Sequence, residues 1–324
     1  MQELHIGEND AGQRFDKYLK KLLAEAPGSF VYKMLRKKNI TLNGKKADGT
    51  EKLSCGDEVK LFLSDETYEK FRAKSKTVMP EAFSGSEKTL RQLKVLYEDA
   101  DILIINKPSG MLSQKARPED VSANEYILSY LLREGALTGE EMRTFRPSVC
   151  NRLDRNTSGI LIAGKTLKGL QEMSKALKER TIQKYYRCVV KGEVLREDYL
   201  KGWLVKDERE NKVTVSTVKP KSADAAPIET AYRPIWTGGG YTGLEVYLIT
   251  GRSHQIRAHL ASIGHPIIGD VKYGDAGTNE QFRRQCKVKS QMLHAYRIVF
   301  ADGREVIAPC GAEFARVEEW CKNR

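Results

Sequence analysis

The sequence predicts an α+β protein in two unequal parts, and three features of the chain support this prediction. Residues 65–89 are polar and show little apolar periodicity, so we expect a linker between two folded parts. The segment before the linker, residues 1–64, has room for two helices and a small sheet. The segment after it, residues 90–324, is rich in short apolar runs of strand length. These runs predict a mostly antiparallel mixed sheet with helices packed on it.

The composition narrows the class of protein. Hydrophobic residues make up 40% of the 324 residues, which is enough for a substantial core. Lys and Arg number 55 against 43 Asp and Glu, so the net charge is +12. This charge favours a polyanionic partner, nucleic acid first and an anionic membrane surface second; an ordinary basic protein is the alternative. No apolar run approaches the ~20 residues needed to cross a bilayer, and the first residues lack an apolar signal region. These features predict a cytoplasmic protein.

Residues 1–64 are expected to form a small module of helices and strands. In the first predicted helix, Gln13–Leu23, the apolar side chains fall on one face. The second predicted helix, Phe30–Lys38, has Ser29 as a candidate N-cap. The predicted strands are the strand and turn at Ile40–Lys46 and the alternating strand Asp57–Leu63. The second helix carries a basic face formed by Lys33, Arg36, Lys37 and Lys38.

The part after the linker is expected to contain both strands and helices. The apolar runs Leu93–Tyr97 and Ile102–Ile105 have the length of strands. Lys168–Lys178 is expected to be an amphipathic helix. The other predicted helices are Val121–Arg133 and residues 312–322. The other predicted strands are Ile160–Ala163, Thr181–Gly192 and residues 200–205, 213–218, 228–235, 241–250, 291–299 and 305–308.

Asp154 is the leading candidate for a catalytic acid. It lies between Arg152 and Arg155, whose guanidinium groups favour an ionised carboxylate. Residues 156–159 form turns readily, and Ile160–Ala163 is expected to be a buried strand, so the acid would be held rigidly. The alternative is an ordinary group of surface ion pairs.

Residues 159–166, Gly-Ile-Leu-Ile-Ala-Gly-Lys-Thr, match the phosphate-binding pattern G-x-x-x-x-G-K-[ST]. That loop must wrap its backbone N–H groups around phosphate, and it should follow a buried strand. Here the middle residues are themselves the predicted strand, and the preceding segment is charged. We therefore interpret the match as accidental.

A second motif, Leu248–Gly274, combines a strand end, a helix start and several charged side chains. The helix is expected to begin near Ser253, where free N–H groups and the helix dipole suit a phosphate. Arg252 and Arg257 add positive charge. Three histidines are spaced five and six residues apart, so they do not share a helical face as paired metal ligands would. We therefore predict no metal site from these histidines, which are His254, His259 and His265.

Both motifs resemble the large-subunit-type pseudouridine synthases, the RluA family. Arg152-Leu153-Asp154-x-x-Thr157-Ser158-Gly159 is similar to the catalytic signature of that family, which usually has a His where this chain has Asn151. Leu248–Gly274 is similar to its G-R-x-H-Q-I-R-x-H-L block and the G-H-P-I-x-G-D-x-x-Y-G that follows. The turn Asn106–Met111 and the strand Thr181–Gly192 are similar to its K-P-x-G and K-x-Y motifs.

The resemblance implies a pseudouridine synthase domain over residues 90–324, which isomerises uridine without a cofactor. It implies that Asp154 acts on the ribose–uracil unit, as a nucleophile or through a glycal route. Tyr186 would stack on the base, Arg257 would pair with Asp154, and Arg152 would hold the gap left by a flipped nucleotide. The other residues expected to contact RNA in this domain are Arg155, Lys107, Arg252 and His254.

The module at residues 1–64 is similar to the S4 RNA-binding domain, through the sequence LRKKNITLNGKKA and the basic helix. This resemblance implies RNA contacts by Lys33, Arg36, Lys37 and Lys38; the alternative is a solvated basic face. The expected substrate is structured RNA, with ribosomal RNA favoured and transfer RNA second, and the expected state is a monomer. Two alternative functions stay open: an RNA-binding protein with an inactive synthase domain, and a phosphate-loop NTPase.

Overall fold

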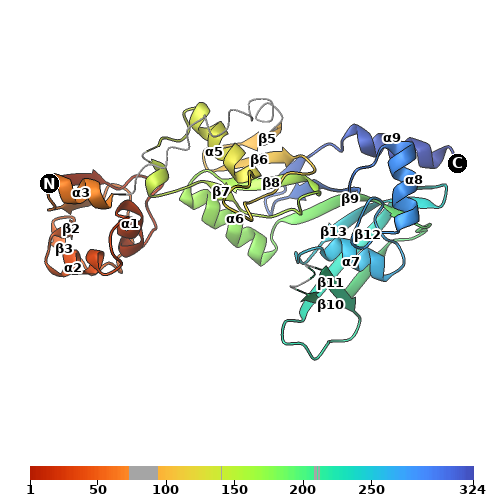
Figure 1. Ribbon diagram of the computed structural model, residues 1–324, viewed down its shortest axis with the longest axis horizontal. Coiled ribbons are helices and arrows are strands. Elements are labelled where there is room, and N and C mark those ends of the chain that lie inside the picture. The colour runs from red at the N-terminus through yellow and green to blue at the C-terminus, as the bar shows by residue number, and fades with distance from the viewer. Residues whose placement is uncertain (73–93, 140, 208–209, 211) are drawn as a thin grey trace.

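The computed structural model describes residues 1–72, 94–139, 141–207, 210 and 212–324. A small N-terminal unit lies at one end of the molecule, and the rest of the chain builds a long sheet with helices around it (Figure 1). The buried apolar side chains of residues 6–63 form one cluster, and those of residues 102–321 form another. Each part therefore has a hydrophobic core of its own.

The small unit contains a four-stranded antiparallel sheet with strand order β1-β4-β2-β3. Helix α1 contributes Phe15, Leu19 and Leu22 to the core, and α2 contributes Val31 and Leu35. Strand β1 was not predicted, because only four residues with little burial form it. The elements are β1 Gln2–His5, α1 Phe15–Leu22, α2 Phe30–Arg36, β2 Ile40–Leu42, β3 Lys45–Lys46 and β4 Glu58–Leu61.

The prediction that Ser29 caps α2 is wrong. Its backbone lies in the helical region, with φ −81° and ψ −15°, and its side chain makes no capping hydrogen bond. An N-cap normally has extended dihedrals, which aim the side-chain oxygen at the first free N–H groups. Helix α2 therefore begins without a side-chain cap.

The predicted linker at 65–89 begins with a helix, α3 (Asp65–Phe71). Ser64 caps it by accepting a hydrogen bond from the Thr67 N–H at 3.2 Å. Phe71 packs on Phe30 of α2, with ring centroids 4.7 Å apart, so α3 belongs to the small unit. The rest of the predicted linker, from residue 73, lies outside the described residues.

The long sheet contains eleven strands among the described residues, in the order β11-β10-β12-β13-β9-β14-β8-β6-β5, with β15 on β14 and β7 on β8. Among the described strands of this sheet, only β14 and β8 pair in parallel, so the sheet is mostly antiparallel, as predicted. The strands are β5 Lys94–Glu98, β6 Ile102–Lys107, β7 Ser148–Val149, β8 Ser158–Gly164, β9 Gln183–Lys191, β10 Asp198–Asp207, β11 Lys212–Ser216, β12 Ala226–Gly238, β13 Tyr241–Leu248, β14 Leu293–Val299 and β15 Glu305–Ile307.

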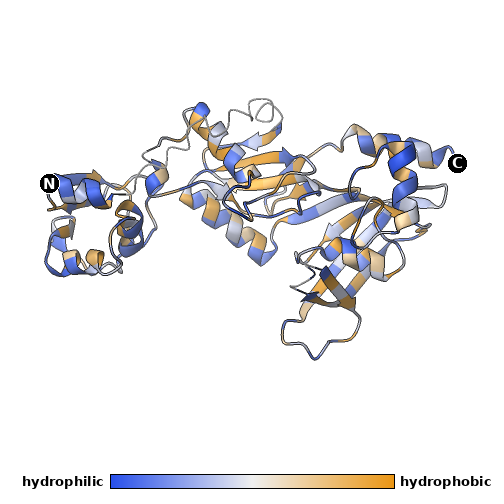
Figure 2. Cartoon of the chain, in the orientation of Figure 1, coloured by the Kyte–Doolittle hydropathy of each residue, from blue (hydrophilic) through white to orange (hydrophobic). Residues whose placement is uncertain are grey.

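Helices cover this sheet and bury its centre. Helix α6 packs against β8, and α5 against β7 (Figure 1). The central strands are strongly hydrophobic (Figure 2), and every side chain of Ile102–Ile105 and Ile160–Ala163 is buried. Helix α8 was not predicted, because its sequence is polar and only Thr278, Phe282 and Cys286 are buried. The helices of this part are α5 Ala123–Arg133, the 3₁₀ turn η2 Glu141–Arg143, α6 Leu167–Glu179, α7 Gln255–Ser262, α8 Ala276–Cys286 and α9 Ala312–Lys322.

The parallel contact between β8 and β14 depends on Gly159. Its φ is +110°, a conformation that side chains rarely adopt, and a Cβ at this position would lie 2.2 Å from the Ala295 carbonyl oxygen. Glycine therefore lets the start of β8 approach β14 closely, which fixes the position of the turn just before it. None of the helices in the described part of the chain has the length and apolarity of a membrane-spanning segment.

Candidate active site

A cleft of about 1110 Å³ opens where the turn before β8 faces β9 and the start of α7. Asp154 comes from that turn, Tyr186 from β9, and His254 and Arg257 from the second motif. Asp154 and Arg257 are 103 positions apart in the sequence and in direct contact. The two motifs therefore form a single site.

Hydrogen bonds hold the turn that carries Asp154. The Thr157 N–H donates to the Asp154 carbonyl at 3.0 Å, which closes the turn. The Leu153 N–H donates to the Ser113 hydroxyl at 3.0 Å, and this hydroxyl donates to the Leu153 carbonyl at 2.9 Å. Gln291 donates to the buried Thr157 hydroxyl at 3.3 Å. The backbone on both sides of Asp154 is fixed, whereas its side chain stays 26% exposed to the cleft.

Asn151 stands where a His is usual in the resembling family, and its side chain bonds the neighbouring strand. Its Oδ1 accepts from the Ile162 N–H at 2.8 Å, and its Nδ2 donates to the Ile160 carbonyl at 3.3 Å. The amide thus continues the ladder of β8 as a backbone group would. Asn151 therefore supports the strand behind the acid, and its bonds do not involve the carboxylate of Asp154.

Arg257 is a rigid partner of the acid. Its Nη1 donates to Asp154 Oδ2 at 2.8 Å, while its Nε and Nη2 form a two-point contact with Asp270 at 2.7 and 2.8 Å. Asp270 is fully buried and also accepts from the N–H groups of Lys272 and Tyr273. Burial opposes the charge of Arg257, but its bonds to the two carboxylates outweigh this and raise its pKa, so the guanidinium stays charged.

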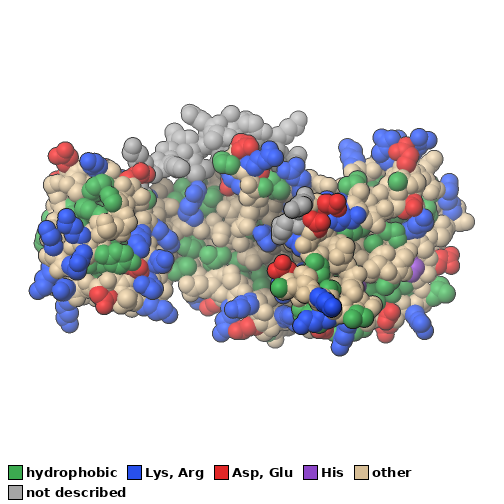
Figure 3. Space-filling view, turned by 60° about the horizontal axis from the view of Figure 1, so that its bottom comes forward, with side chains coloured by type: hydrophobic (Ala, Val, Ile, Leu, Met, Phe, Trp, Pro, Cys, Tyr) green, Lys and Arg blue, Asp and Glu red, His purple; other side chains and the backbone are tan. Residues whose placement is uncertain are grey.

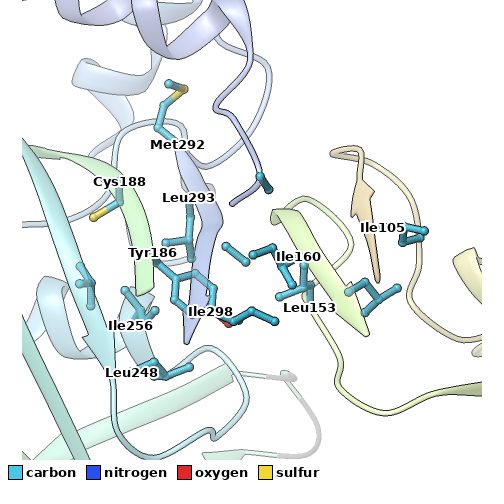
Figure 4. Packing of buried hydrophobic residues seen from close by; sticks show 14 of the residues in the cluster. Ile105, Leu153, Ile160, Tyr186, Cys188, Leu248, Ile256, Met292, Leu293 and Ile298 are labelled. Carbon is cyan, nitrogen blue, oxygen red and sulfur yellow. The ribbon is translucent and has the colours of Figure 1, made fainter. Parts of the chain in front are cut away.

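Tyr186 lies at the border between the core and the cleft. It is 8% exposed and belongs to the same hydrophobic cluster as Leu248, Ile256 and Leu293 (Figure 4). Burial, helped by the charge of Asp154, raises the pKa of Tyr186 well above its usual range, so the hydroxyl keeps its proton at neutral pH. The neighbouring Tyr185 does not line this cleft; its ring stacks on that of Tyr247, with ring centroids 5.0 Å apart.

The cleft has a basic rim, part of which was predicted from the sequence. Arg152, Arg155 and Arg252 line the cleft and are exposed, and His254 lines it with a half-buried ring. Lys184 also lines it, two residues before Tyr186 on the same strand. Because alternate strand residues share a face, the K-x-Y spacing could have predicted that Lys184 lies on the same side as Tyr186. The other basic residues along the cleft are Lys115, Lys178, Arg180, Lys206 and Lys272.

The prediction that Lys107 contacts RNA is wrong. Its side chain is fully buried, and its Nζ donates to the backbone carbonyls of Pro108, Met111 and Arg155 at 2.8 to 3.0 Å. Burial lowers the pKa of Lys107 to about 7, against the opposing effect of the Asp154 charge. Through its three hydrogen bonds, the amine of Lys107 joins the turn at 108–111 to Arg155, the residue that follows Asp154.

The four basic residues of α2 and its end, Lys33, Arg36, Lys37 and Lys38, are all exposed. Lysines and arginines are spread over the small unit in Figure 3. Helix α2 ends at Arg36, and Lys38 has a left-handed backbone with φ +58°, which turns the chain toward β2. These four cations lie far from the cleft motifs in the sequence, on the unit with its own core, so they form a second basic surface.

The match to the phosphate-binding pattern, residues 159–166, lies largely in strand β8, as the sequence predicted. The backbone of Gly159–Gly164 is paired with β6 across the ladder, so its N–H groups cannot wrap around a phosphate. The Lys165 amine bonds the Glu98 carboxylate at 2.7 Å, and Thr166 caps α6 by accepting from the Gly169 N–H at 3.0 Å. This stretch is part of the fold of the sheet.

The three histidines of the second motif make separate contacts. The ring of His259 is buried against the Thr230 hydroxyl at 3.1 Å, and burial lowers its pKa to about 4. His265 contacts the Lys191 carbonyl at 3.0 Å. His254 is the one that faces Asp154, with Nε2 at 3.9 Å from Oδ2.

Comparison with protein families and with related sequences gives a consistent result. Residues 101–262 match the family model described as RNA pseudouridylate synthase. The "Ribosomal large subunit pseudouridine synthase C" of Vibrio vulnificus (strain CMCP6) is 31% identical over 328 residues, covering 98% of this chain and 95% of its own. The protein of the same name from Pasteurella multocida (strain Pm70) is 32% identical over 308 residues, covering 92% and 85%.

Solved structures show the same fold. "Human RNA Pseudouridylate Synthase Domain Containing 4" superposes with a TM-score of 0.59 at 20% identity, covering 71% of this chain and 92% of its own. "Human RNA Pseudouridylate Synthase Domain Containing 1" superposes with a TM-score of 0.54 at 21% identity, covering 68% and 84%. The predicted α+β class with a mostly antiparallel sheet is confirmed.

Proposed function

The chain belongs to the RNA pseudouridylate synthase family, and on that premise we propose that it isomerises uridine to pseudouridine in ribosomal RNA. The observation that carries the proposal is the contact between Asp154 and Arg257 in the cleft, at 2.8 Å. It joins a carboxylate on a fixed turn to a cation from the second motif. The names of the relatives point to the RNA of the large ribosomal subunit, and transfer RNA is the second candidate.

The reaction exchanges one bond of the ribose for another. The bond from C1′ to N1 of uracil breaks, the base rotates, and C1′ bonds to C5; N1 gains a proton and C5 loses one. Of the two carboxylate oxygens of Asp154, Oδ2 is the one that accepts a hydrogen bond among the described residues, from Arg257. This arrangement leaves Oδ1 to act on the ribose–uracil unit, as a nucleophile at C1′ or as a base in a glycal route.

Tyr186 is proposed to hold the base beside the acid. Its ring borders the cleft, so a flipped uracil can stack on it. Because its hydroxyl stays protonated at neutral pH, it can donate a proton or a hydrogen bond but cannot act as a resting base. Arg257 is proposed to orient Asp154, since its own two-point contact with Asp270 prevents it from swinging away.

The uridine must leave its stack before it can reach Asp154, which costs a few kcal/mol and is least costly in loops. Arg152 is exposed on the same turn as the acid, so it is proposed to fill the gap in the RNA. Arg155, Arg252 and His254 are proposed to contact the substrate along the cleft.

The small unit is proposed to be an S4-type RNA-binding domain that adds affinity through Lys33, Arg36, Lys37 and Lys38. The core of this unit, against which Tyr68 and Phe71 of α3 pack, supports a proposed domain boundary after Phe71 instead of at residue 64. A cytoplasmic monomer completes the proposal; sedimentation of the free protein tests the monomer.

The experiment uses unmodified transcripts of large-subunit ribosomal RNA and of transfer RNA, incubated with the purified protein. Pseudouridines are mapped by carbodiimide labelling and primer extension, and the same map is made for RNA from cells with and without the gene. The proposal expects pseudouridine at defined sites in ribosomal RNA that are absent without the gene. Binding of either RNA with no new pseudouridine would favour the alternative of an inactive synthase domain.

A further inference from the structure

His254 is held at the edge of the acid by an unusual backbone and by one hydrogen bond to its ring. It precedes α7 with φ +54° and ψ 12°, a left-handed conformation that few residues other than glycine adopt. Its Nδ1 lies 3.0 Å from the Tyr273 hydroxyl, and its Nε2 points toward Asp154. The two ring nitrogens therefore face different partners.

The hydrogen-bond partners of Tyr273 indicate where the ring hydrogen of His254 lies. The Tyr273 oxygen accepts a hydrogen bond from the Val213 N–H at 2.8 Å, because a backbone N–H can only donate. The Tyr273 oxygen has a second lone pair, so this bond alone does not set the direction of the contact with His254. We assign the single hydroxyl hydrogen of Tyr273 to His254 Nδ1, because Nδ1 is the acceptor found within reach of it among the described residues. A neutral imidazole that accepts at Nδ1 carries its hydrogen on Nε2.

The Nε2–H of His254 has no strong partner in the described part of the free protein. Its distance of 3.9 Å from Asp154 Oδ2 is too long for a hydrogen bond. That carboxylate oxygen is already bonded by Arg257. The side chain of His254 is 12% exposed, on the cleft side. A donor is thus aimed at the space that the proposed substrate fills.

We propose that His254 is a neutral hydrogen-bond donor, through Nε2–H, to an oxygen of the nucleotide held at Asp154, and that Tyr273 is the positioning residue that fixes this tautomer. The inference rests on the proposed function and assigns the role of one contact within it. Tyr273 also places its ring 5.2 Å from the Arg257 guanidinium, so one side chain supports both partners of the acid.

The surroundings of His254 favour the neutral form. Burial lowers its pKa, and the charges of Arg257 and Lys272 act in the same direction, whereas those of Asp154 and Asp270 oppose it. A neutral donor does not titrate where an ordinary histidine does. A general acid in the same place would lose activity as pH rises through its pKa.

Amide substitutions separate the two ring nitrogens. In His254→Gln the terminal NH₂ reaches the place of Nε2, whereas in His254→Asn it reaches the place of Nδ1. A left-handed backbone tolerates Asn better than Gln, so strain alone predicts the opposite order of activity. We expect kcat of His254→Gln to stay within about tenfold of wild type, and kcat of His254→Asn and His254→Ala to fall about 100-fold, as when one positioned donor is lost.

Tyr273→Phe keeps the ring near Arg257 and removes only the hydroxyl. We expect it to lower kcat about tenfold with KM nearly unchanged, because the donor is less well fixed, while RNA is still bound. The pH profile of His254→Gln should match that of wild type. Activity of His254→Asn equal to or above that of His254→Gln would overturn the inference. A wild-type pH profile with a fall in activity near the pKa of a histidine that disappears in His254→Gln would overturn it as well.

A spectroscopic readout needs no turnover. In ¹⁵N-labelled wild-type protein, two-dimensional NMR should show His254 with an unprotonated Nδ1 and a protonated Nε2, the signals being assigned by their absence in folded His254→Gln. The opposite tautomer, or an imidazolium at neutral pH, would overturn the inference. If wild type forms no pseudouridine, the proposed function fails, and the NMR result still decides the tautomer.

Discussion

Replacing Lys107 with Met should destabilise the larger part of the molecule and slow the reaction without weakening RNA binding. The fully buried amine of Lys107 donates to three backbone carbonyls, including that of Arg155 next to the proposed catalytic acid. Met fills a similar volume but offers no hydrogens. The Arg155 carbonyl keeps a hydrogen bond from the Gly110 N–H at 2.9 Å, so the carbonyls of Pro108 and Met111 are the two that lose their donor. Each carbonyl left without a donor costs about 1–3 kcal/mol, and relaxation recovers part of this. We therefore expect a loss of about 2–4 kcal/mol in the free energy of unfolding.

Denaturation followed by tryptophan fluorescence measures this loss for the relevant part alone. The three tryptophans, Trp203, Trp236 and Trp320, all lie outside the small unit. Lys94→Met is the matched control, because Lys94 is exposed on the neighbouring strand β5. If Lys107→Met loses no more stability than Lys94→Met, the three bonds do not hold the turn. A lower RNA affinity with intact stability would restore the sequence-based prediction of an RNA contact.

The pKa of Lys107 adds a pH dependence of defined sign. Burial lowers this pKa from 10.5 to about 7, so between these values the unfolded chain holds a proton that the folded chain does not. The contribution of Lys107 to the free energy of unfolding therefore rises with pH above about 7 and is constant below it. Relative to Lys107→Met, wild type should gain roughly 1.4 kcal/mol per pH unit between about pH 7 and pH 9. A gap that stays constant or narrows over this range would contradict the shift.

Three further predictions test other parts of the account. Changing the four basic residues of the small unit to Ala should flatten the salt dependence of RNA binding by about one unit of slope per lost phosphate contact and leave kcat intact; an unchanged slope would exclude this surface. Lys165→Ala should leave isomerisation largely intact, and neither wild type nor the variant should hydrolyse ATP or GTP. Loss of the ion pair with Glu98 should lower the free energy of unfolding by about 1 kcal/mol. Tight, Lys165-dependent nucleotide binding would show that the phosphate-loop match is real. Asn151→His should cost about 1–2 kcal/mol of stability, because an imidazole cannot make both bonds to β8, while the activity of folded protein changes little; a gain of activity with unchanged stability would contradict the structural role of Asn151.

The sequence was sufficient to predict the contact between the two proposed catalytic residues, but not the contacts that support them. Asp154 and Arg257 lie in specific motifs, and the resemblance implied their contact, which the structure contains. Lys107 also lies in a motif, but its environment depends on the Arg155 carbonyl, 48 positions away. No local pattern distinguishes a lysine enclosed by three carbonyls from one that faces RNA. Tertiary contacts decided its burial.

Two helices without a strong apolar stripe, α3 and α8, were not predicted from the sequence. Helix α3 has no buried residues, and only Tyr68 and Phe71 pack against the core of the small unit. Its polar sequence is therefore the same signal that predicts a linker. Helix 312–322 was predicted with its observed bounds, and there Val317 and Cys321 are buried. Periodicity identifies a helix when the helix covers a core, and it fails when the helix lies at the border of one.

The most direct test of the account is a pair of measurements on Asp154→Asn. This variant keeps the shape of the side chain but removes its charge and its reactive oxygen. Release of tritium from RNA that carries 5-³H-uridine reports the chemical step, and binding of the same RNA reports recognition. Because RNA contacts come mainly from basic side chains, we expect affinity to change little or to rise slightly, while tritium release falls to background. Appreciable turnover by correctly folded Asp154→Asn would contradict the mechanism.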